Sequence, residues 1–198
     1  MRQIIDTPRA SLIAGCVIAG VLLAARLIAS DAVEVLAFLV RFLHVLAAMV
    51  WVGLVVFVNF VQLVALQGAD PQVRGFLAKS VIPQVAAWYR HASTVAVATG
   101  AILLVTSGYL LPRLAFATEV GTPAARSALL WAGVLGGLAM WMFVHMYIWP
   151  SVQVVIGLRP GDADAKARAH AKVVLFARLN LVLAVPVTLA MVAAAHLY

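Results

Sequence analysis

The chain has 198 residues, of which 65% are hydrophobic and 11% are charged, whereas roughly a quarter of the residues of a soluble domain are charged. So few polar side chains cannot cover a soluble fold of this length, which excludes a secreted or cytosolic globule. The net charge is +7, but the basic residues are dispersed at the ends of apolar stretches and form no stripe with interleaved aromatic residues, so we expect no nucleic-acid partner.

Five apolar stretches are long enough to cross a bilayer, which requires about 20 mostly apolar residues. They cover residues 11–29, 33–66, 81–112, 126–157 and 171–197. Helices satisfy their own backbone hydrogen bonds in lipid. We therefore predict an all-α integral membrane protein with about five transmembrane helices in a single domain, residues 1–198. Helices two to five are expected to form a four-helix bundle, with the first helix packed outside it.

The segments between these stretches predict the topology. The first stretch follows Arg2 and Arg9 as a signal peptide would, but its uninterrupted length and the lack of a convincing cleavage site predict a retained helix. Polar segments at 68–79, 113–126 and 159–172 are expected to be loops. Basic residues are more numerous on the side that carries the N-terminus, which predicts a bacterial inner-membrane protein with its N-terminus cytoplasmic and its C-terminus outside.

Ionisable side chains inside a span are costly unless they are paired or ligated, so each is a candidate for function. No Asp or Glu lies in the middle of any predicted span, which argues against a carboxylate-based transporter. The ionisable residues there are His44, His91, His145, His196, Arg41, Arg90 and Arg178. An anionic ligand would neutralise the arginines, and haem brings two propionates.

The four histidines are interpreted as ligands of one or two b-type haems, because imidazole is a common axial ligand of haem iron. Counting the helical rise from the ends of the predicted spans gives two depths. We expect His91 and His145 to ligate an inner haem. His44, alone or with His196, would ligate an outer one. The only cysteine is Cys16, so covalent attachment through CxxCH is excluded.

Two arginines and two tryptophans complete the predicted cofactor site. Arg41 precedes His44 by three residues and so shares its helix face, and Arg90 adjoins a second predicted ligand. We expect both guanidinium groups to bind propionates through charge-assisted hydrogen bonds. Trp51 and Trp141 are expected to line or cap the macrocycle.

Each of these residues also has a simpler interpretation. A histidine in a membrane can hydrogen-bond across helices, an arginine can extend toward the interface, and tryptophans often form interfacial belts. His170 is expected to be solvated in a charged loop. Asn59 and Asn180 are expected to form interhelical hydrogen bonds.

The sequence RFLHVLAAMVWVGLVVFVNFVQ, together with a later Trp-Pro pair and an Asn-to-Pro spacing of six, resembles the membrane domain of bacterial urate hydroxylases, the urate oxidase N-terminal family. Weaker similarity extends to HemJ-type protoporphyrinogen oxidases and to the copper resistance D family. The residues that carry the resemblance are Arg41, His44, Trp51, Gly53, Trp149, Pro150, Asn180 and Pro186. The resemblance implies a helical bundle with a haem b site that uses His44.

Three functions are compatible with this pattern. The leading hypothesis is a membrane-bound b-type cytochrome or haem-binding subunit that transfers electrons to or from quinone, a partner redox protein or another subunit of a membrane complex. The alternatives are a haem-dependent oxidase or hydroxylase acting on urate or a porphyrin precursor, and a cofactor-free structural subunit. An enzyme needs a pocket with convergent polar groups. The candidates for such groups are few: Gln62, Tyr89, Thr94 and Asn180. We therefore favour an electron-transfer subunit over a self-sufficient enzyme, and any catalytic residue stays unassigned.

Overall fold

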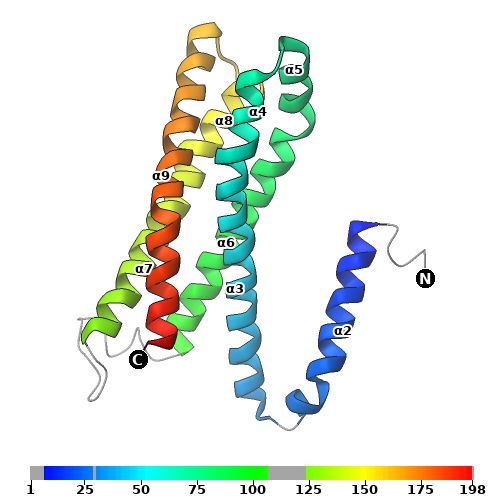
Figure 1. The fold of residues 1–198 in the computed structure, drawn as a ribbon, viewed down its shortest axis with the longest axis vertical. Coiled ribbons are helices and arrows are strands. Elements are labelled where there is room, and N and C mark those ends of the chain that lie inside the picture. Colours follow the sequence, from blue (N-terminus) through cyan, green and yellow to red (C-terminus); the bar gives the residue numbers. More distant parts are fainter. Residues whose placement is uncertain (1–6, 29, 107–123, 198) are drawn as a thin grey trace. The chain divides into compact units, whose positions relative to one another are not determined.

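The computed structural model describes residues 7–28, 30–106 and 124–197, and every element in these ranges is helical (Figure 1). The chain divides into two compact units, residues 1–40 and 41–198, which are described separately. The helices, in chain order, are α2 (Pro8–Ile28), α3 (Ala32–Phe57), α4 (Leu63–Gly68), α5 (Pro71–Ser80), α6 (Ile82–Thr106), α7 (Ala124–Met142), α8 (Trp149–Val155) and α9 (Ala163–His196). Two π-helical segments, η1 (Val58–Gln62) and η2 (Phe143–Ile148), join α3 to α4 and α7 to α8.

Three of these helical segments are long and apolar enough to cross a membrane: Ala32–Gly68, Ala124–Val155 and Ala163–His196. They match the second, fourth and fifth predicted spans, which confirms an all-helical chain suited to a bilayer. Within the described ranges, α2 offers only the shorter apolar stretch Pro8–Ala24. Helix α6 contains Gln84, Arg90 and His91, and the predicted end of its span at 107–112 lies outside the described residues. A total of five spans therefore remains a prediction.

The first unit contains α2 and the beginning of α3. Thr7 precedes α2, and its hydroxyl oxygen accepts a hydrogen bond from the Ala10 amide at 3.2 Å, which satisfies one free amide of the first turn. The helix exposes large apolar side chains on successive positions, including Val21 and Leu22. A helix that is apolar on all sides is suited to lipid or to other helices.

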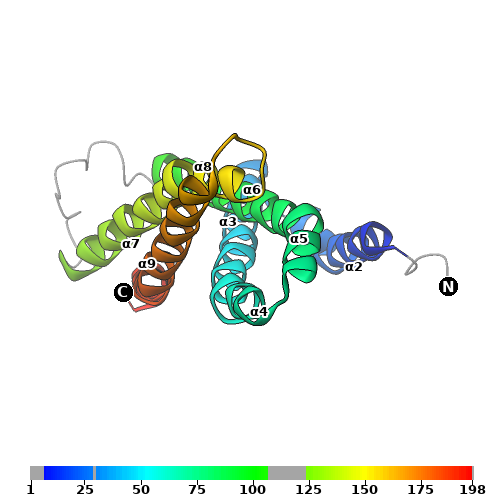
Figure 2. The same ribbon diagram turned by 90° about the horizontal axis from the view of Figure 1, so that it is seen from above.

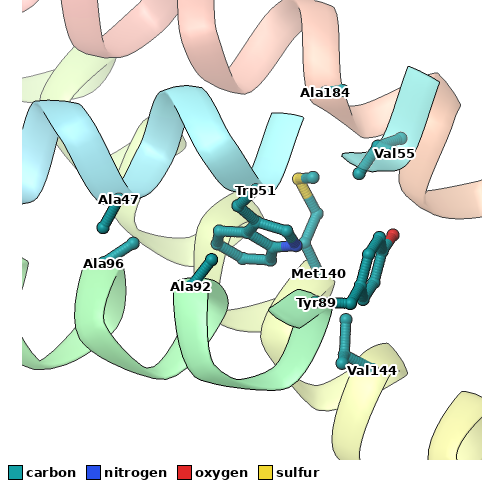
Figure 3. Packing of buried hydrophobic residues seen from close by; sticks show 9 residues of the cluster. All are labelled: Ala47, Trp51, Val55, Tyr89, Ala92, Ala96, Met140, Val144 and Ala184. Atoms are coloured by element: carbon teal, nitrogen blue, oxygen red, sulfur yellow. The ribbon is translucent and has the colours of Figure 1, made fainter. Parts of the chain in front are cut away.

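Four helices share the core of the second unit. Helix α9 packs along α7 and α8, and α6 packs against α5, α7 and η2 (Figures 1 and 2). From α3, the Trp51 ring lies against α6, where small alanine side chains leave room for it (Figure 3). The buried cluster consists of Ala47, Trp51, Val55, Tyr89, Ala92, Ala96, Met140, Val144 and Ala184. This core fixes the positions of the polar side chains described below.

Glycines let α7 and α9 approach closely. A methyl group added at Gly133 would lie 3.0 Å from the side chain of Met191, and one added at Gly136 would overlap that of Val187. The same addition at Gly137 would meet nothing within 4 Å. Gly136 therefore faces α9, whereas Gly137 does not.

Both π-helical segments have local causes. The Asn59 side chain donates to the Val55 carbonyl at 2.9 Å and to the Ala177 carbonyl of α9 at 3.1 Å. A side chain that occupies the carbonyl four residues earlier competes with the α-helical backbone bond and widens the turn. In the second segment, Pro150 has no amide hydrogen and its ring crowds the carbonyl of Met146, so the turn before it also widens. The bond from Asn59 to α9 confirms the interhelical role predicted for this residue.

Two predicted loops are helical in the structure. Residues 71–80 form α5, which Asp70 caps by accepting a hydrogen bond from the Val73 amide at 2.8 Å. Helix α9 begins at Ala163, eight residues before the predicted start, and its cap is a bond from the Ala165 amide to Asp162 at 2.7 Å. His170, predicted to lie in a loop, is therefore on a helix, and it is exposed as expected. Both segments were too polar to be recognised from apolar length alone.

Candidate functional site

His44 is fixed by a hydrogen bond that determines its tautomer. Its Nδ1 atom lies 2.8 Å from the Ala96 carbonyl oxygen and 3.3 Å from the Thr99 hydroxyl, both on α6. A carbonyl only accepts, so Nδ1 must carry the proton. The lone pair of a neutral ring is then on Nε2, which makes no hydrogen bond to a described residue. Histidines that ligate metals use this arrangement, with the remote ring N–H donated to a carbonyl.

The ring of His44 lies directly against the α6 backbone because Gly100 has no side chain. A methyl group at Gly100 would be 3.0 Å from Cε1 and 3.4 Å from Nδ1 of the ring. On α3, His44 is separated from the buried residues Ala47, Trp51 and Val55 by three, seven and eleven positions, so all four share one helix face. His44 thus extends the core-facing stripe of α3.

His145 uses both of its ring nitrogens for hydrogen bonds. Nδ1 donates to the Trp141 carbonyl at 3.0 Å, and Nε2 accepts from the Thr94 hydroxyl at 3.1 Å. The Trp141 indole N–H in turn donates to Thr94 at 3.3 Å, and the Trp141 and His145 rings stack with their centroids 4.6 Å apart. Thr94 therefore joins α6 to α7 and η2 through two side-chain bonds. Metal ligation at Nε2 would first require the Thr94 bond to break.

The other predicted ligands and one predicted propionate partner are exposed. His91 is exposed on α6, one turn before Thr94, so it lies on the same side of that helix as His145. His196 is exposed in the last turn of α9, and Arg41 is exposed on α3. Among the residues that the structure describes, no group of three or more His, Cys, Asp or Glu could hold a metal ion.

His44 and His145 contact opposite faces of α6. Their partners Ala96 and Thr94 are two positions apart, which is about 200° around an α-helix. Along the axis, Thr94 lies about 3 Å from Ala96 and about 9 Å from Gly100, which the His44 ring also contacts. The helix therefore lies between the two imidazoles, and they cannot bind the same iron. The two depths predicted from the ends of the spans stay a prediction, since these helices cross at an angle (Figure 2) and a residue count does not give depth directly.

Arg90 lies at a pocket lined by residues of α6, α8, α9 and both π-helical segments. Its guanidinium carbon is 3.8 Å from the centre of the Trp149 ring, and its Nε donates to the Ala86 carbonyl at 3.4 Å. The cavity is partly open and has a volume of about 40 Å³, enough for about two or three water molecules. The lining residues are Val58, Gln62, Ile82, Val85, Ala86, Tyr89, Arg90, Val144, Ile148, Trp149, Val152, Val173 and Ala177. Both π-helical segments contribute to this wall, and such segments are frequent at functional sites.

A second polar group lies in the apolar core. Asn180 is fully buried, and neither atom of its amide has a hydrogen bond; the buried indole nitrogen of Trp51 also lacks one. The Tyr89 hydroxyl lies near both of these groups, but the contacts do not reach hydrogen-bond geometry. The interhelical hydrogen bond predicted for Asn180 is therefore not formed in this structure. Unpaired buried polar atoms of this kind mark places where ordered water or a ligand binds.

The four predicted polar candidates lie in three different places. Gln62 and Tyr89 line the Arg90 pocket, Thr94 binds His145, and Asn180 is in the core. Sequence reasoning missed Thr99, the second partner of His44. Nothing in the sequence distinguishes it, because threonines that bond to their own helix are common in membrane spans.

No known protein family, curated protein or solved structure matches the chain. The resemblance to the urate oxidase N-terminal family is therefore still a prediction, and function must be argued from the site itself.

Proposed function

We propose that the chain is a membrane-bound haem b protein of the bacterial inner membrane that transfers electrons, with His44 as an axial ligand. The observation that carries the proposal is the 2.8 Å contact from Nδ1 to the Ala96 carbonyl, which leaves the Nε2 lone pair free. The electron donor or acceptor would be quinone or a redox partner in the same membrane, with the N-terminus of the chain cytoplasmic.

The residues near His44 are chemically suited to a porphyrin. Gly100 gives the imidazole a close, fixed seat on α6, and Arg41 is one turn away on α3 with a charge suited to a propionate. The neighbours of His44 on α3, among them Val45 and Ala47, are apolar, a setting that would tune the reduction potential of a bound haem. Bound haem would supply the one-electron chemistry. The protein residues would hold the imidazole, fix its tautomer and keep its Nε2 available.

The proposal favours one haem at His44 over two. At the other predicted site, His145 already satisfies both ring nitrogens, so its state in the structure is the simpler role of a hydrogen bond across helices. A second haem between His91 and His145 would require Thr94 to release Nε2.

The test is purification of the full chain in mild detergent, followed by a pyridine haemochrome assay and an absorption spectrum. We expect bound haem in the wild type and in His170→Ala, which removes an exposed histidine, and a loss of most haem in His44→Ala. Well-folded wild-type protein that contains no haem and takes up none on addition would contradict the proposal. Full haem content in His44→Ala would reject His44 as the ligand.

A second candidate function is that of a haem-dependent oxidase. The observation that favours it is the separation of His44 from His145 by α6. That separation prevents His44 and His145 from holding the same iron. A second ligand of a haem at His44 would then be His196, another group or a substrate. A five-coordinate, high-spin spectrum that changes on adding a small ligand would favour an oxidase. A six-coordinate, low-spin spectrum in both redox states would favour electron transfer.

A further inference from the structure

Arg90 carries a positive charge in a part of the chain that contains no acidic residue. Helices α6, α7 and α8 and both π-helical segments have no Asp or Glu, and no carboxylate pairs with Arg90 among the described residues. The guanidinium group is part-buried and held over Trp149 at 3.8 Å, so it is positioned and not freely extended. A charge in such surroundings is costly unless an anion neutralises it.

The rest of the pocket limits what that anion can be. Apart from Arg90 and Gln62, its walls are largely apolar, and the partly open cavity of about 40 Å³ has room for only a small end group of a larger molecule. The Gln62 side-chain oxygen is buried without a hydrogen-bond partner, and the buried residue Tyr89 lines the same pocket. Arg90 is the one charged residue among the described residues of the lining, so the second negative charge of a phosphate would be unbalanced, and a neutral carbonyl would leave the arginine charge unbalanced.

From these observations we infer that the pocket at Arg90 binds a carboxylate group carried on an apolar molecule. The planar guanidinium fork matches the two oxygens of a carboxylate. One water in the pocket can donate to Gln62. The valines and isoleucines of the wall suit an alkyl chain or a macrocycle edge. The carboxylate could come from a fatty acid or from a haem propionate. The inference does not depend on haem binding at His44.

The first experiment measures the melting temperature of the full chain in zwitterionic nanodiscs with dodecanoate or dodecanol, at alkaline pH. The two probes share a tail and differ in the carboxylate. We expect dodecanoate to raise the melting temperature and dodecanol to have little effect. Equal shifts with both probes, or none with dodecanoate, would overturn the inference using wild-type protein alone.

Variants then identify the arginine. Arg90→Gln should weaken dodecanoate binding roughly 10- to 100-fold, the scale of a charge-assisted hydrogen-bonded pair. Arg178→Gln removes an exposed arginine from a membrane-spanning helix and should leave binding unchanged. Arg90→Lys keeps the charge but loses the planar fork, so intermediate binding is expected. Unchanged affinity in Arg90→Gln would place the carboxylate elsewhere and overturn the inference.

A second arm distinguishes the two sources. Haem and its dimethyl ester share a macrocycle, but only haem has free propionates. If a propionate occupies the pocket, Arg90→Gln should weaken the binding of haem but not the binding of its dimethyl ester. In that case dodecanoate should also no longer raise the melting temperature of haem-loaded protein. If a fatty acid is the ligand, haem-loaded protein should still respond. A chain that binds no haem but responds selectively to dodecanoate would refute the proposed function and retain this site.

Discussion

Replacing Thr94 with valine should destabilise the contact between α6 and α7 while keeping the shape of the side chain. The hydroxyl donates to His145 Nε2 and accepts from the Trp141 indole, so its loss leaves two polar groups without partners. Interhelical hydrogen bonds in membrane proteins contribute about 0.6 kcal/mol each on average and up to about 1.7 kcal/mol. Two such bonds give an expected loss of about 1 to 2 kcal/mol in the free energy of unfolding.

The measurement is reversible unfolding of the purified chain in mixed micelles as the fraction of denaturing detergent rises. Thr188→Val is the matched control, because the hydroxyl of Thr188 bonds only to the Ala184 carbonyl of its own helix, at 2.7 Å. It should change stability by less than about 0.5 kcal/mol. If Thr94→Val and Thr188→Val have the same effect, the Thr94 network does not hold the helices together and the reasoning is wrong.

Two further predictions concern helix packing and capping. Gly136→Ala should lower stability by about 1 to 3 kcal/mol because the new methyl group overlaps the stiff Val187 side chain. Gly137→Ala should be neutral or raise stability by up to about 1 kcal/mol. Circular dichroism melting curves compare the two variants, and equal melting temperatures would contradict the predicted contact. Asp70→Ala should cost about 1 kcal/mol in α5 by removing the cap on the Val73 amide. Faster hydrogen exchange of the α5 amides would report this loss, and Asp70→Asn, which keeps the acceptor, should exchange as the wild type does.

Apolar length predicted the long apolar helices and failed for the polar helical segments. The three candidate spans lie within a few residues of their predicted bounds at most ends, because a bilayer requires a fixed number of apolar residues. Helix α5 and the first two turns of α9 were missed, although Asp70 followed by Pro71 is a recognised helix start. Helix-capping signals, used together with hydropathy, predict α5.

The candidate site could be predicted only in part. Of the seven ionisable residues singled out as costly in lipid, three have defined partners, namely His44, His145 and Arg90. The partners themselves could not be predicted, since a backbone carbonyl such as that of Ala96 has no sequence signature. Which face of α6 each histidine meets depends on helix crossing, which hydropathy does not encode.

The widened turns have a consequence for the register of buried positions. Through η1, buried residues occur every fourth position: Trp51, Val55, Asn59 and Leu63. In an ordinary α-helix each such step overshoots a full turn by about 40°, so Leu63 would be rotated about 120° away from Trp51.

A single-residue deletion exposes what this register maintains. Removing Phe60, whose side chain is exposed, should let η1 relax into a regular helix with its backbone bonds intact. Leu63 would then follow Trp51 by eleven helical positions, only about 20° from a whole number of turns, so the later residues of the span would keep their faces. The widened turn therefore accommodates one extra residue without rotating the helix beyond it, so chain length at this point, and not only side-chain identity, specifies the site.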